Sequence, residues 1–191
     1  MEDRNQHFAV TLKSIRKTKN WSLDRAAQAT GVSKAMLGQI ERGESSPTLA
    51  TLWKIAEGFE TALSTFIEPK PLDNQDARVR TATELRRKPV SDDMLMASMF
   101  TYDERFGFEM IELTLMPGYE RVAEPHEQGT TEHVIVVKGD MELLLNGEWL
   151  PMPEGSALRF AADCVHGYRN LNDQPAVFHN LIHHANISPD R

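Results

Sequence analysis

The part of this chain that most limits its fold is residues 21–42, with the sequence WSLDRAAQATGVSKAMLGQIER. Ser22 can cap one short helix, Gly31 can end that helix in the left-handed conformation, and Ser33 can cap the next helix. A turn this tight holds the second helix in a fixed and exposed position. Helices presented in this way are typical of proteins that enter the major groove of DNA.

Helical periodicity extends on both sides of this segment, up to about residue 67. Phe8, Leu12 and Ile15 recur at the spacing that places them on one face of an earlier helix. We therefore expect a five-helix domain over residues 1–68. The apolar residues of its later helices also fall on one side of each helix: Leu37 and Ile40, then Leu49, Leu52, Ile55 and Ala56.

The pattern changes after residue 68. Residues 69–80 are polar and contain Pro69 and Pro71, so we expect a linker there. Residues 81–191 show short apolar runs separated by turn residues, including the hairpin signal Asn146-Gly147. This pattern predicts an all-β domain. Its expected strands are 94–102, 108–115, 132–137, 141–145, 157–160, 166–171 and 176–184.

The charge of the chain is unevenly divided between these two parts. The whole sequence carries a net charge of −7, which by itself argues against a DNA-binding protein. Residues 1–68, however, hold 9 Lys/Arg and 8 Asp/Glu, a net charge of +1, whereas the rest holds 12 and 20, a net charge of −8. The acidic second domain is a poor partner for DNA, so we expect it to have a function other than DNA binding. The basic cluster Lys13, Arg16, Lys17 and Lys19 fits either a phosphate-binding surface or a solvated helix face.

The remaining composition indicates an intracellular protein. The single cysteine, Cys164, cannot form a disulfide within the chain, which fits a reducing cytoplasm. The amino terminus is acidic and polar, unlike a signal peptide. No run approaches the roughly 20 apolar residues of a membrane span, so we expect a cytoplasmic protein with no membrane partner.

Residues spaced over about 8–67 carry a resemblance to a known family. They resemble the phage-repressor-like, or xenobiotic-response-element, helix-turn-helix family, which implies a DNA-binding domain. The matching residues are Leu12, Arg16, Ser22-Leu23, Ala26-Ala27, Gly31-Val32-Ser33, Leu37, Gln39-Ile40-Glu41-Arg42-Gly43, Pro47-Thr48-Leu49, Leu52 and Ile55-Ala56.

The resemblance implies which residues read bases. In this family, the positions of Lys34, Ala35 and Gln39 face base edges from the recognition helix. Gln39 could pair with adenine and Lys34 could donate to guanine, whereas Ala35 offers only a contact to a thymine methyl. The resemblance also pairs Arg16 with Glu41, which ties the first helix to the third, while a phosphate contact by Arg16 stays open. A second reading of the domain is a helical bundle that binds protein instead of DNA.

Phosphate contacts hold such a domain in place without reading the sequence of the DNA. The remaining residues expected at the DNA surface are Ser33, Arg42, Ser45, Ser46 and Thr48.

The second domain resembles the cupin family over about residues 85–185. The first motif is Gly118-x7-His126-x-Gln128-x3-Glu132-x6-Gly139, and the second is Gly155-x10-His166-x3-Asn170. The resemblance implies a small antiparallel jelly-roll barrel. The fold class is therefore α then β, with a five-helix lambda-repressor-like domain followed by a cupin barrel.

Relatives in the cupin family use these motif residues to bind a metal. This chain keeps His126, Glu132 and His166 but has Gln128 where the family has a second histidine. Three ligands still make a competent divalent site, with zinc preferred and iron, manganese or nickel as alternatives. Two other readings stay open: a metal-free pocket that hydrogen-bonds a ligand through the same residues, and a structural polar cluster. Strand alternation turns His133 away from this group.

Four more residues are expected to contact a ligand of the barrel. A ligand carboxylate could be bound by Arg121, Arg159 and Tyr168, and one histidine of the last expected strand, His179 or His183, could also reach the interior.

Together these features predict a one-component transcriptional regulator. We expect a homodimer that binds a double-stranded operator and whose cupin domain binds a small effector, by family analogy an amino acid or related metabolite. Effector binding would shift the population of two arrangements and so change operator affinity. The alternatives are a metal-dependent cupin enzyme with a DNA-binding head, and a constitutive DNA binder whose barrel only dimerises. The operator and the sign of regulation do not follow from the residues.

Overall fold

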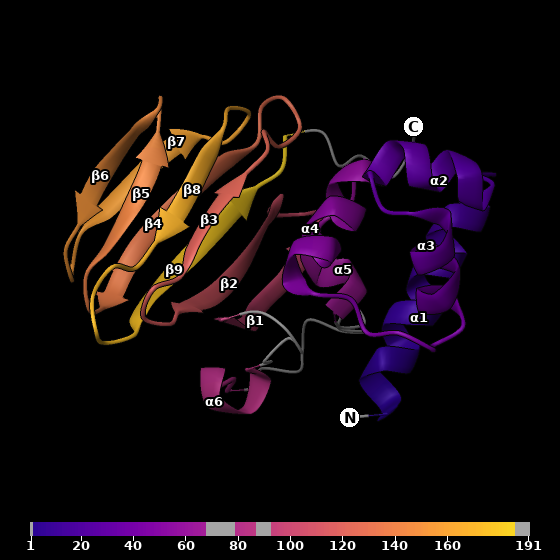
Figure 1. Ribbon diagram of the computed structural model, residues 1–191, viewed down its shortest axis with the longest axis horizontal. Coiled ribbons are helices and arrows are strands. Elements are labelled where there is room, and N and C mark those ends of the chain that lie inside the picture. The colour runs from indigo at the N-terminus through magenta and orange to yellow at the C-terminus, as the bar shows by residue number, and fades with distance from the viewer. Residues whose placement is uncertain (1, 68–78, 87–92, 186–191) are drawn as a thin grey trace. The chain divides into compact units, whose positions relative to one another are not determined.

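The computed structural model describes residues 2–67, 79–86 and 93–185, with the side chains of the first four left out. The chain forms two compact units, Met1–Ala77 and Arg78–Arg191 (Figure 1). The expected linker, residues 69–80, lies almost entirely outside the described residues. Within the described ranges, no helix is both long enough and apolar enough to cross a membrane.

The first unit is helical, and the expected five-helix domain is confirmed. Its core is made of large apolar side chains, among which Leu12, Phe59 and Phe66 are almost completely buried. The helices are α1 (Glu2–Thr18), α2 (Leu23–Thr30), α3 (Lys34–Glu41), α4 (Leu49–Gly58) and α5 (Leu63–Ile67).

Local capping interactions explain the tight turn between α2 and α3. The Ser22 hydroxyl accepts a hydrogen bond from the backbone N–H of Arg25 at 3.1 Å, and the Ser33 hydroxyl accepts one from Met36 at 3.2 Å. Gly31 ends α2 with φ of 65°, in the region that glycine adopts at least cost. The predicted helix-turn-helix is therefore present.

The backbones of α2 and α4 approach each other closely at Gly58. A methyl group added at this glycine would lie 2.6 Å from the carbonyl oxygen of Ala29 and 2.6 Å from the Cα of Thr30. These are backbone atoms that cannot rotate away. Gly58 thus sets how closely α4 packs against the carboxyl end of α2.

The second unit is a two-sheet antiparallel β domain, as the cupin resemblance predicted (Figure 1). One sheet has the order β1-β2-β9-β4-β7 and the other has the order β3-β8-β5-β6. The strands are β1 (Met94–Asp103), β2 (Phe108–Leu115), β3 (Glu120–Ala123), β4 (Thr131–Lys138), β5 (Met141–Leu145), β6 (Glu148–Met152), β7 (Ala157–Ala161), β8 (His166–Arg169) and β9 (Ala176–His183).

Three elements of this unit were not predicted from the sequence. They are β3, β6 and the short helix α6 (Ala82–Leu85), which Thr81 caps. Both missed strands are short edge strands of the smaller sheet, and β6 contains Pro151, a residue tolerated only at edges. The expected hairpin between β5 and β6 is present, with Asn146 at φ 54° and Gly147 at φ 82°.

Strand register determines which side chains of the larger sheet face the interior. On β4, Glu132 pairs with Phe160 of β7 and with Ile182 of β9, and all three are buried. Directly paired residues in a sheet point to the same side, so these side chains share the inner face. His133 lies on the opposite face, as strand alternation predicted.

Candidate functional site

Helix α3 presents the expected DNA-reading residues on its outer face. Lys34, Ala35 and Gln39 are exposed, whereas Leu37 and Ile40 are 1% exposed and pack in the core. This division follows from the helical period, because residues three or four positions apart share a face. One face of α3 is therefore packed in the core of the helical unit, and the opposite face is exposed.

Two cations of the expected DNA surface form ion pairs within the chain. The Lys34 Nζ lies 2.8 Å from the Asp24 carboxylate, and Arg42 donates two hydrogen bonds of 2.8 and 2.7 Å to Glu44. All four side chains are more than half exposed. Exposed pairs of this kind contribute little to stability, so phosphates or base edges can replace the carboxylates.

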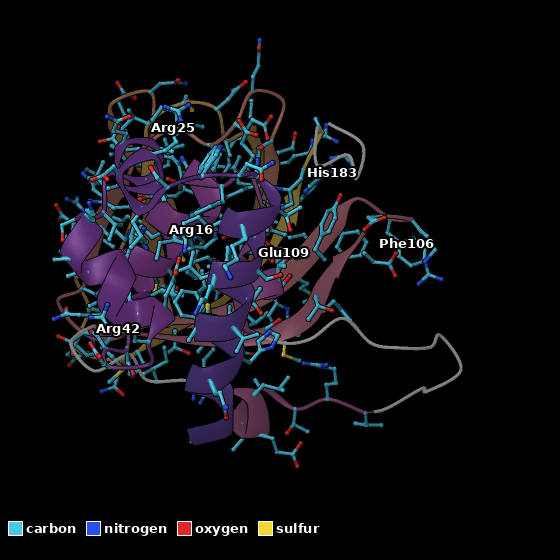
Figure 2. All side chains as sticks on the ribbon, turned by 90° about the vertical axis from the view of Figure 1, so that its right-hand side faces the viewer. Arg16, Arg25, Arg42, Phe106, Glu109 and His183 are labelled. Carbon is cyan, nitrogen blue, oxygen red and sulfur yellow. The ribbon has the colours of Figure 1, made fainter. Side chains whose placement is uncertain are left out.

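Arg16, labelled in Figure 2, forms a different kind of ion pair, because the side chains of Arg16 and its partner Glu41 are only 14% and 7% exposed. Its guanidinium donates to the two carboxylate oxygens of Glu41 at 2.5 and 2.7 Å, and to the carbonyl oxygen of Trp21 at 2.8 Å. The hydrogen bond to Glu41 raises the pKa of Arg16 above its ordinary value. These contacts tie α1 to α3, as the family resemblance implied, and leave little of the guanidinium for a phosphate.

The hydroxyl-bearing residues near α3 divide into two groups. Ser33 and Thr48 use their hydroxyls to cap α3 and α4, where Thr48 accepts from the N–H of Thr51 at 3.1 Å. Ser45 and Ser46 lie in the loop between these helices, half-buried and exposed respectively.

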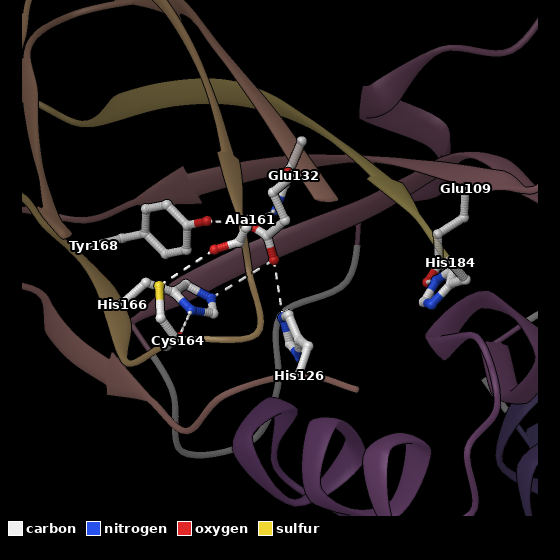
Figure 3. A network of polar contacts seen from close by, with 9 residues as sticks. Glu109, His126, Glu132, Ala161, Cys164, His166, Tyr168 and His184 are labelled. Carbon is white, nitrogen blue, oxygen red and sulfur yellow. Dashed lines mark hydrogen bonds and ion pairs between the residues drawn. The ribbon is translucent and has the colours of Figure 1, made fainter. Parts of the chain in front are cut away.

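A second cluster of chemistry-bearing residues lies inside the β domain. His126, Glu132 and His166 place one ligand atom each within 4.8 Å of one another (Figure 3). His126 Nε2 is 2.9 Å from Glu132 Oε1, and His166 Nε2 is 3.6 Å from the same oxygen. Glu132 and His166 are each 1% exposed.

These three residues come from separate elements that the fold brings together. Glu132 lies on β4 of the larger sheet and His166 begins β8 of the smaller one. His126 lies between β3 and β4, where its backbone N–H donates to the carbonyl oxygen of Ala162 at 2.9 Å. The cluster therefore spans the interior between the two sheets.

The hydrogen bond of His166 to the backbone defines the state of its ring. Nδ1 lies 2.9 Å from the carbonyl oxygen of Cys164, which can only accept, so Nδ1 carries a proton. Nε2, which faces the Glu132 carboxylate, is then a lone pair that a metal can bind when the ring is neutral, and a hydrogen-bond donor to Glu132 when the ring is protonated. Metal-binding histidines in proteins are oriented by this type of backbone contact.

The other oxygen of Glu132 is held by two neutral donors. Glu132 Oε2 accepts from the hydroxyl of Tyr168 and from Asn180 Nδ2, the latter at 2.9 Å. Burial tends to raise the pKa of Glu132, but the hydrogen bonds and charges of His126 and His166 outweigh it and hold the pKa well below its usual range. Burial and the adjacent carboxylate raise the pKa of Tyr168 well above its ordinary value.

The donor set and spacing fit a divalent metal ion. Bonds of about 2.1 Å around a tetrahedral ion place neighbouring ligand atoms about 3.4 Å apart. The two distances to Glu132 Oε1, 2.9 and 3.6 Å, lie on either side of that value. Two imidazoles and one carboxylate also match the donors that zinc, iron, manganese and nickel accept.

The other expected site residues have different positions. Gln128 is exposed, in a turn between His126 and β4. Arg121 pairs in register with Tyr168, so both face the interior. Arg159 and His179 were expected to contact a ligand inside the barrel. This prediction is wrong, because neither side chain faces the interior.

Strand register explains this correction. Arg159 pairs with His133, and His179 pairs with Glu112, which lies 3.4 Å away. His183, two residues beyond Leu181, shares this outer face with His179. The sequence reasoning missed Asn180, the polar residue that faces inward on this strand. Its signal was one polar residue in the apolar alternation of Phe178, Asn180 and Ile182.

Comparison with known proteins agrees with this architecture. The chain matches the helix-turn-helix family over residues 12–66 and the cupin domain family over residues 111–182. It is 45% identical over 184 residues to the HTH-type transcriptional regulator SutR of Escherichia coli K12, covering 96% of this chain and 98% of SutR. It is 25% identical over 182 residues to the regulator PuuR of the same organism, covering 90% and 92% of the two chains.

A solved structure shows the same combination of domains. The crystal structure of an HTH_3 family transcriptional regulator from Vibrio cholerae superimposes with a TM-score of 0.82 at 38% identity, covering 97% of this chain and 99% of that one. The chain belongs to the family of transcriptional regulators that join a DNA-binding helix-turn-helix domain to a cupin domain.

Proposed function

We propose that this regulator responds to a small effector, such as an amino acid or a related metabolite, through a divalent metal site in its cupin domain. The observation that carries the proposal is the cluster of His126, Glu132 and His166 in the domain that does not read DNA, in which Glu132 and His166 are buried. A transcriptional regulator with such a site in addition to a DNA-binding domain has the parts of a one-component sensor.

On the DNA side, we propose that α3 enters the major groove of the operator. Gln39 and Lys34 would contact bases, Ala35 a thymine methyl, and Arg42 a phosphate. Their exposure supports this role. Two direct base readers give limited discrimination, so we propose a homodimer that places two copies of α3 on half-sites about 34 Å apart.

On the effector side, we propose that His126, Glu132 and His166 bind the metal, with zinc preferred over iron, manganese and nickel. Tyr168 and Asn180 hold the second oxygen of Glu132 and leave the first for the ion. The bound metal would supply an open coordination position for an oxygen, nitrogen or sulfur atom of the effector. Gln128, exposed in its turn, would complete the ligand set only after a rotation toward His126.

Arg121 is the residue that we propose for a carboxylate of the effector. It faces the interior in register with Tyr168, and its positive charge lowers the pKa of that tyrosine against the larger effect of burial. The positive charge of Arg121 therefore acts on Tyr168, whose hydroxyl donates a hydrogen bond to Glu132.

Two measurements on the full chain test this proposed function. Elemental analysis of protein purified without added metal should find a divalent metal that a chelator removes. A gel shift with an operator selected from a random duplex library should then show a change in operator affinity between the metal-loaded and effector-loaded forms. Sequence-independent binding, or operator affinity that no bound ligand alters, would contradict the proposal.

The enzyme alternative is tested with the same protein. A cupin oxygenase or isomerase would consume oxygen or convert substrate in a screen with the metal-loaded chain. We expect no turnover, because a sensor has to release its ligand unchanged. Sustained turnover of any bound compound would favour the enzyme.

A further inference from the structure

Met36 is a large apolar side chain on the outer face of α3. It is 41% exposed, whereas Leu37 and Ile40 of the same helix are almost completely buried. A single exposed apolar residue is common on protein surfaces and needs no special explanation. Met36 differs from such residues in its position, because it lies on the helix that we propose for the major groove.

The helical period places Met36 beside Gln39, the residue that we propose for adenine. Met36 lies three positions before Gln39, and Ala35 lies four positions before it. Both spacings put side chains next to each other on a helix surface. All three side chains are exposed. Gln39 therefore has an apolar neighbour on each side, the methyl group of Ala35 and the thioether of Met36.

The amino-terminal cap of α3 fixes the backbone of Met36. The Ser33 hydroxyl accepts a hydrogen bond from the Met36 N–H at 3.2 Å, and the next residue, Leu37, is buried in the core. Met36 is thus held in the first turn of the helix, and its side chain alone is free to move. An unbranched side chain with a polarizable sulfur adapts well to a neighbouring apolar group.

The cations at the two ends of this exposed face are already paired within the chain. The Lys34 Nζ lies 2.8 Å from the carboxylate of Asp24. The Arg42 guanidinium lies 2.7 Å from the carboxylate of Glu44. Between these two ion pairs, the chemistry that α3 offers to base edges is one amide, that of Gln39, and the two apolar side chains beside it.

The major groove contains one apolar group that matches the thioether. All four bases present hydrogen-bond donors or acceptors there, and only thymine adds a methyl group, on C5. A thioether against this methyl removes apolar surface from water. Against a donor or an acceptor it would displace water and return no hydrogen bond of similar strength. The base that fits Met36 is therefore thymine.

We infer that Met36 reads the operator by contacting the C5 methyl of a thymine, in a base pair next to the adenine that Gln39 reads. This inference rests on one part of the proposed function, the entry of α3 into the major groove. It adds an apolar determinant of sequence preference to the polar contacts of Gln39 and Lys34. The half-site then prefers thymine at one position because of its methyl group and not because of a hydrogen bond.

Replacing single thymines of the selected operator by deoxyuridine tests the inference on the full chain. Deoxyuridine lacks only the C5 methyl and keeps the other groups of the thymine edge. We expect one thymine position at which this replacement, made in one half-site, weakens wild-type binding by roughly fourfold, the equivalent of burying one methyl group. Fluorescence anisotropy titrations at a fixed salt concentration measure the affinity.

The variant Met36→Ala should remove the sensitivity at that position. Its shorter side chain no longer reaches the methyl group, so the thymine and deoxyuridine operators should bind with equal affinity. Alanine also favours the helix, so α3 is expected to form as in the wild type, which helical circular dichroism checks. The matched control is Val10→Ala, which shortens an exposed apolar side chain of α1 and should retain the full loss at the same position.

Two results would overturn the inference. One is a deoxyuridine effect that is the same in wild type and Met36→Ala at every thymine, and the other is a wild-type affinity that no replacement changes. Gln39→Ala distinguishes this failure from failure of the proposed function. If α3 does not enter the groove, Gln39→Ala leaves the base preference unchanged as well. If only the role of Met36 is wrong, Gln39→Ala still relaxes the base preference.

Discussion

At the scale of single residues, the hydrogen bonds of His166 carry the argument for a metal. Its Nδ1 is committed to the Cys164 carbonyl, and its Nε2 faces Glu132 Oε1 at 3.6 Å. A lone pair and a carboxylate repel at that distance unless a proton or a cation lies between them. A metal ion bound by both atoms removes the repulsion without protonating the ring.

Replacing His126 tests the metal site at residue level. His126→Ala removes one ligand without cutting into the core of either sheet, so we expect the bound metal to be lost while the fold is retained. The control is His133→Ala, which removes a histidine from the outer face of β4. Elemental analysis and circular dichroism of both variants check this prediction. Equal metal content in the two variants would exclude His126 as a ligand.

The Arg16–Glu41 pair is expected to stabilise the helical domain. Glu41→Ala leaves the guanidinium shielded and without its carboxylate, which should lower the free energy of unfolding by about 2–4 kcal/mol. Glu44→Ala removes the exposed partner of Arg42 and should leave the free energy of unfolding almost unchanged. Urea denaturation followed by helical circular dichroism measures both. Equal effects would show that burial of the pair does not matter.

At the scale of elements, the position of α3 depends on the packing of its neighbours. Gly58→Ala would push a methyl group into the backbone of Ala29 and Thr30, so we expect a loss of about 1–3 kcal/mol and weaker operator binding. In Gly38→Ala the new methyl would meet side chains alone, the movable end of Arg42 at 3.2 Å and Leu23 Cδ1 at 3.8 Å, an ordinary van der Waals contact. That variant should be neutral or gain up to about 1 kcal/mol from helix propensity. Thermal unfolding that ranks the two in the opposite order would contradict this account.

Two substitutions on the recognition element separate base reading from phosphate binding. Gln39→Ala should cost about 1–3 kcal/mol on the selected operator and relax the preference for one base. Arg42→Ala should weaken binding to all duplexes alike and reduce the salt slope by about 1. Anisotropy titrations over a range of salt concentrations distinguish the two patterns. A base preference unchanged by Gln39→Ala would remove it from the set of base readers.

Elements with local signals could be predicted from the sequence, and elements that depend on pairing could not. Ser22, Gly31 and Ser33 act on their own helix ends, so the helix-turn-helix followed directly from their spacing. Strands β3 and β6 are short edge strands whose existence depends on their neighbours β8 and β5.

The candidate site shows the same division. His126, Glu132 and His166 follow from the resemblance of the two motifs to those of the cupin family. Alternation along β9 carried a signal for Asn180, whereas the neighbours that Arg159 and His179 meet depend on strand register, which no local pattern specifies.

At the scale of the whole molecule, the uneven charge fits two separate tasks. The acidic cupin part contributes no attraction for DNA, so the effect on operator binding that we propose for it would come from a change in how the two reading domains of the proposed dimer are held. Such coupling is reciprocal: an effector that changes operator affinity has its own affinity changed by the same factor when operator is bound.

Operator affinity measured with and without a bound effector tests this account most directly. The full chain is titrated onto the selected operator by fluorescence anisotropy, alone and with a small molecule that raises its unfolding temperature, in the wild type and in His126→Ala. We predict a change in operator affinity of roughly fivefold or more in the wild type and no change in the variant. Equal operator affinity in all four titrations would contradict the claim that the cupin site controls DNA binding.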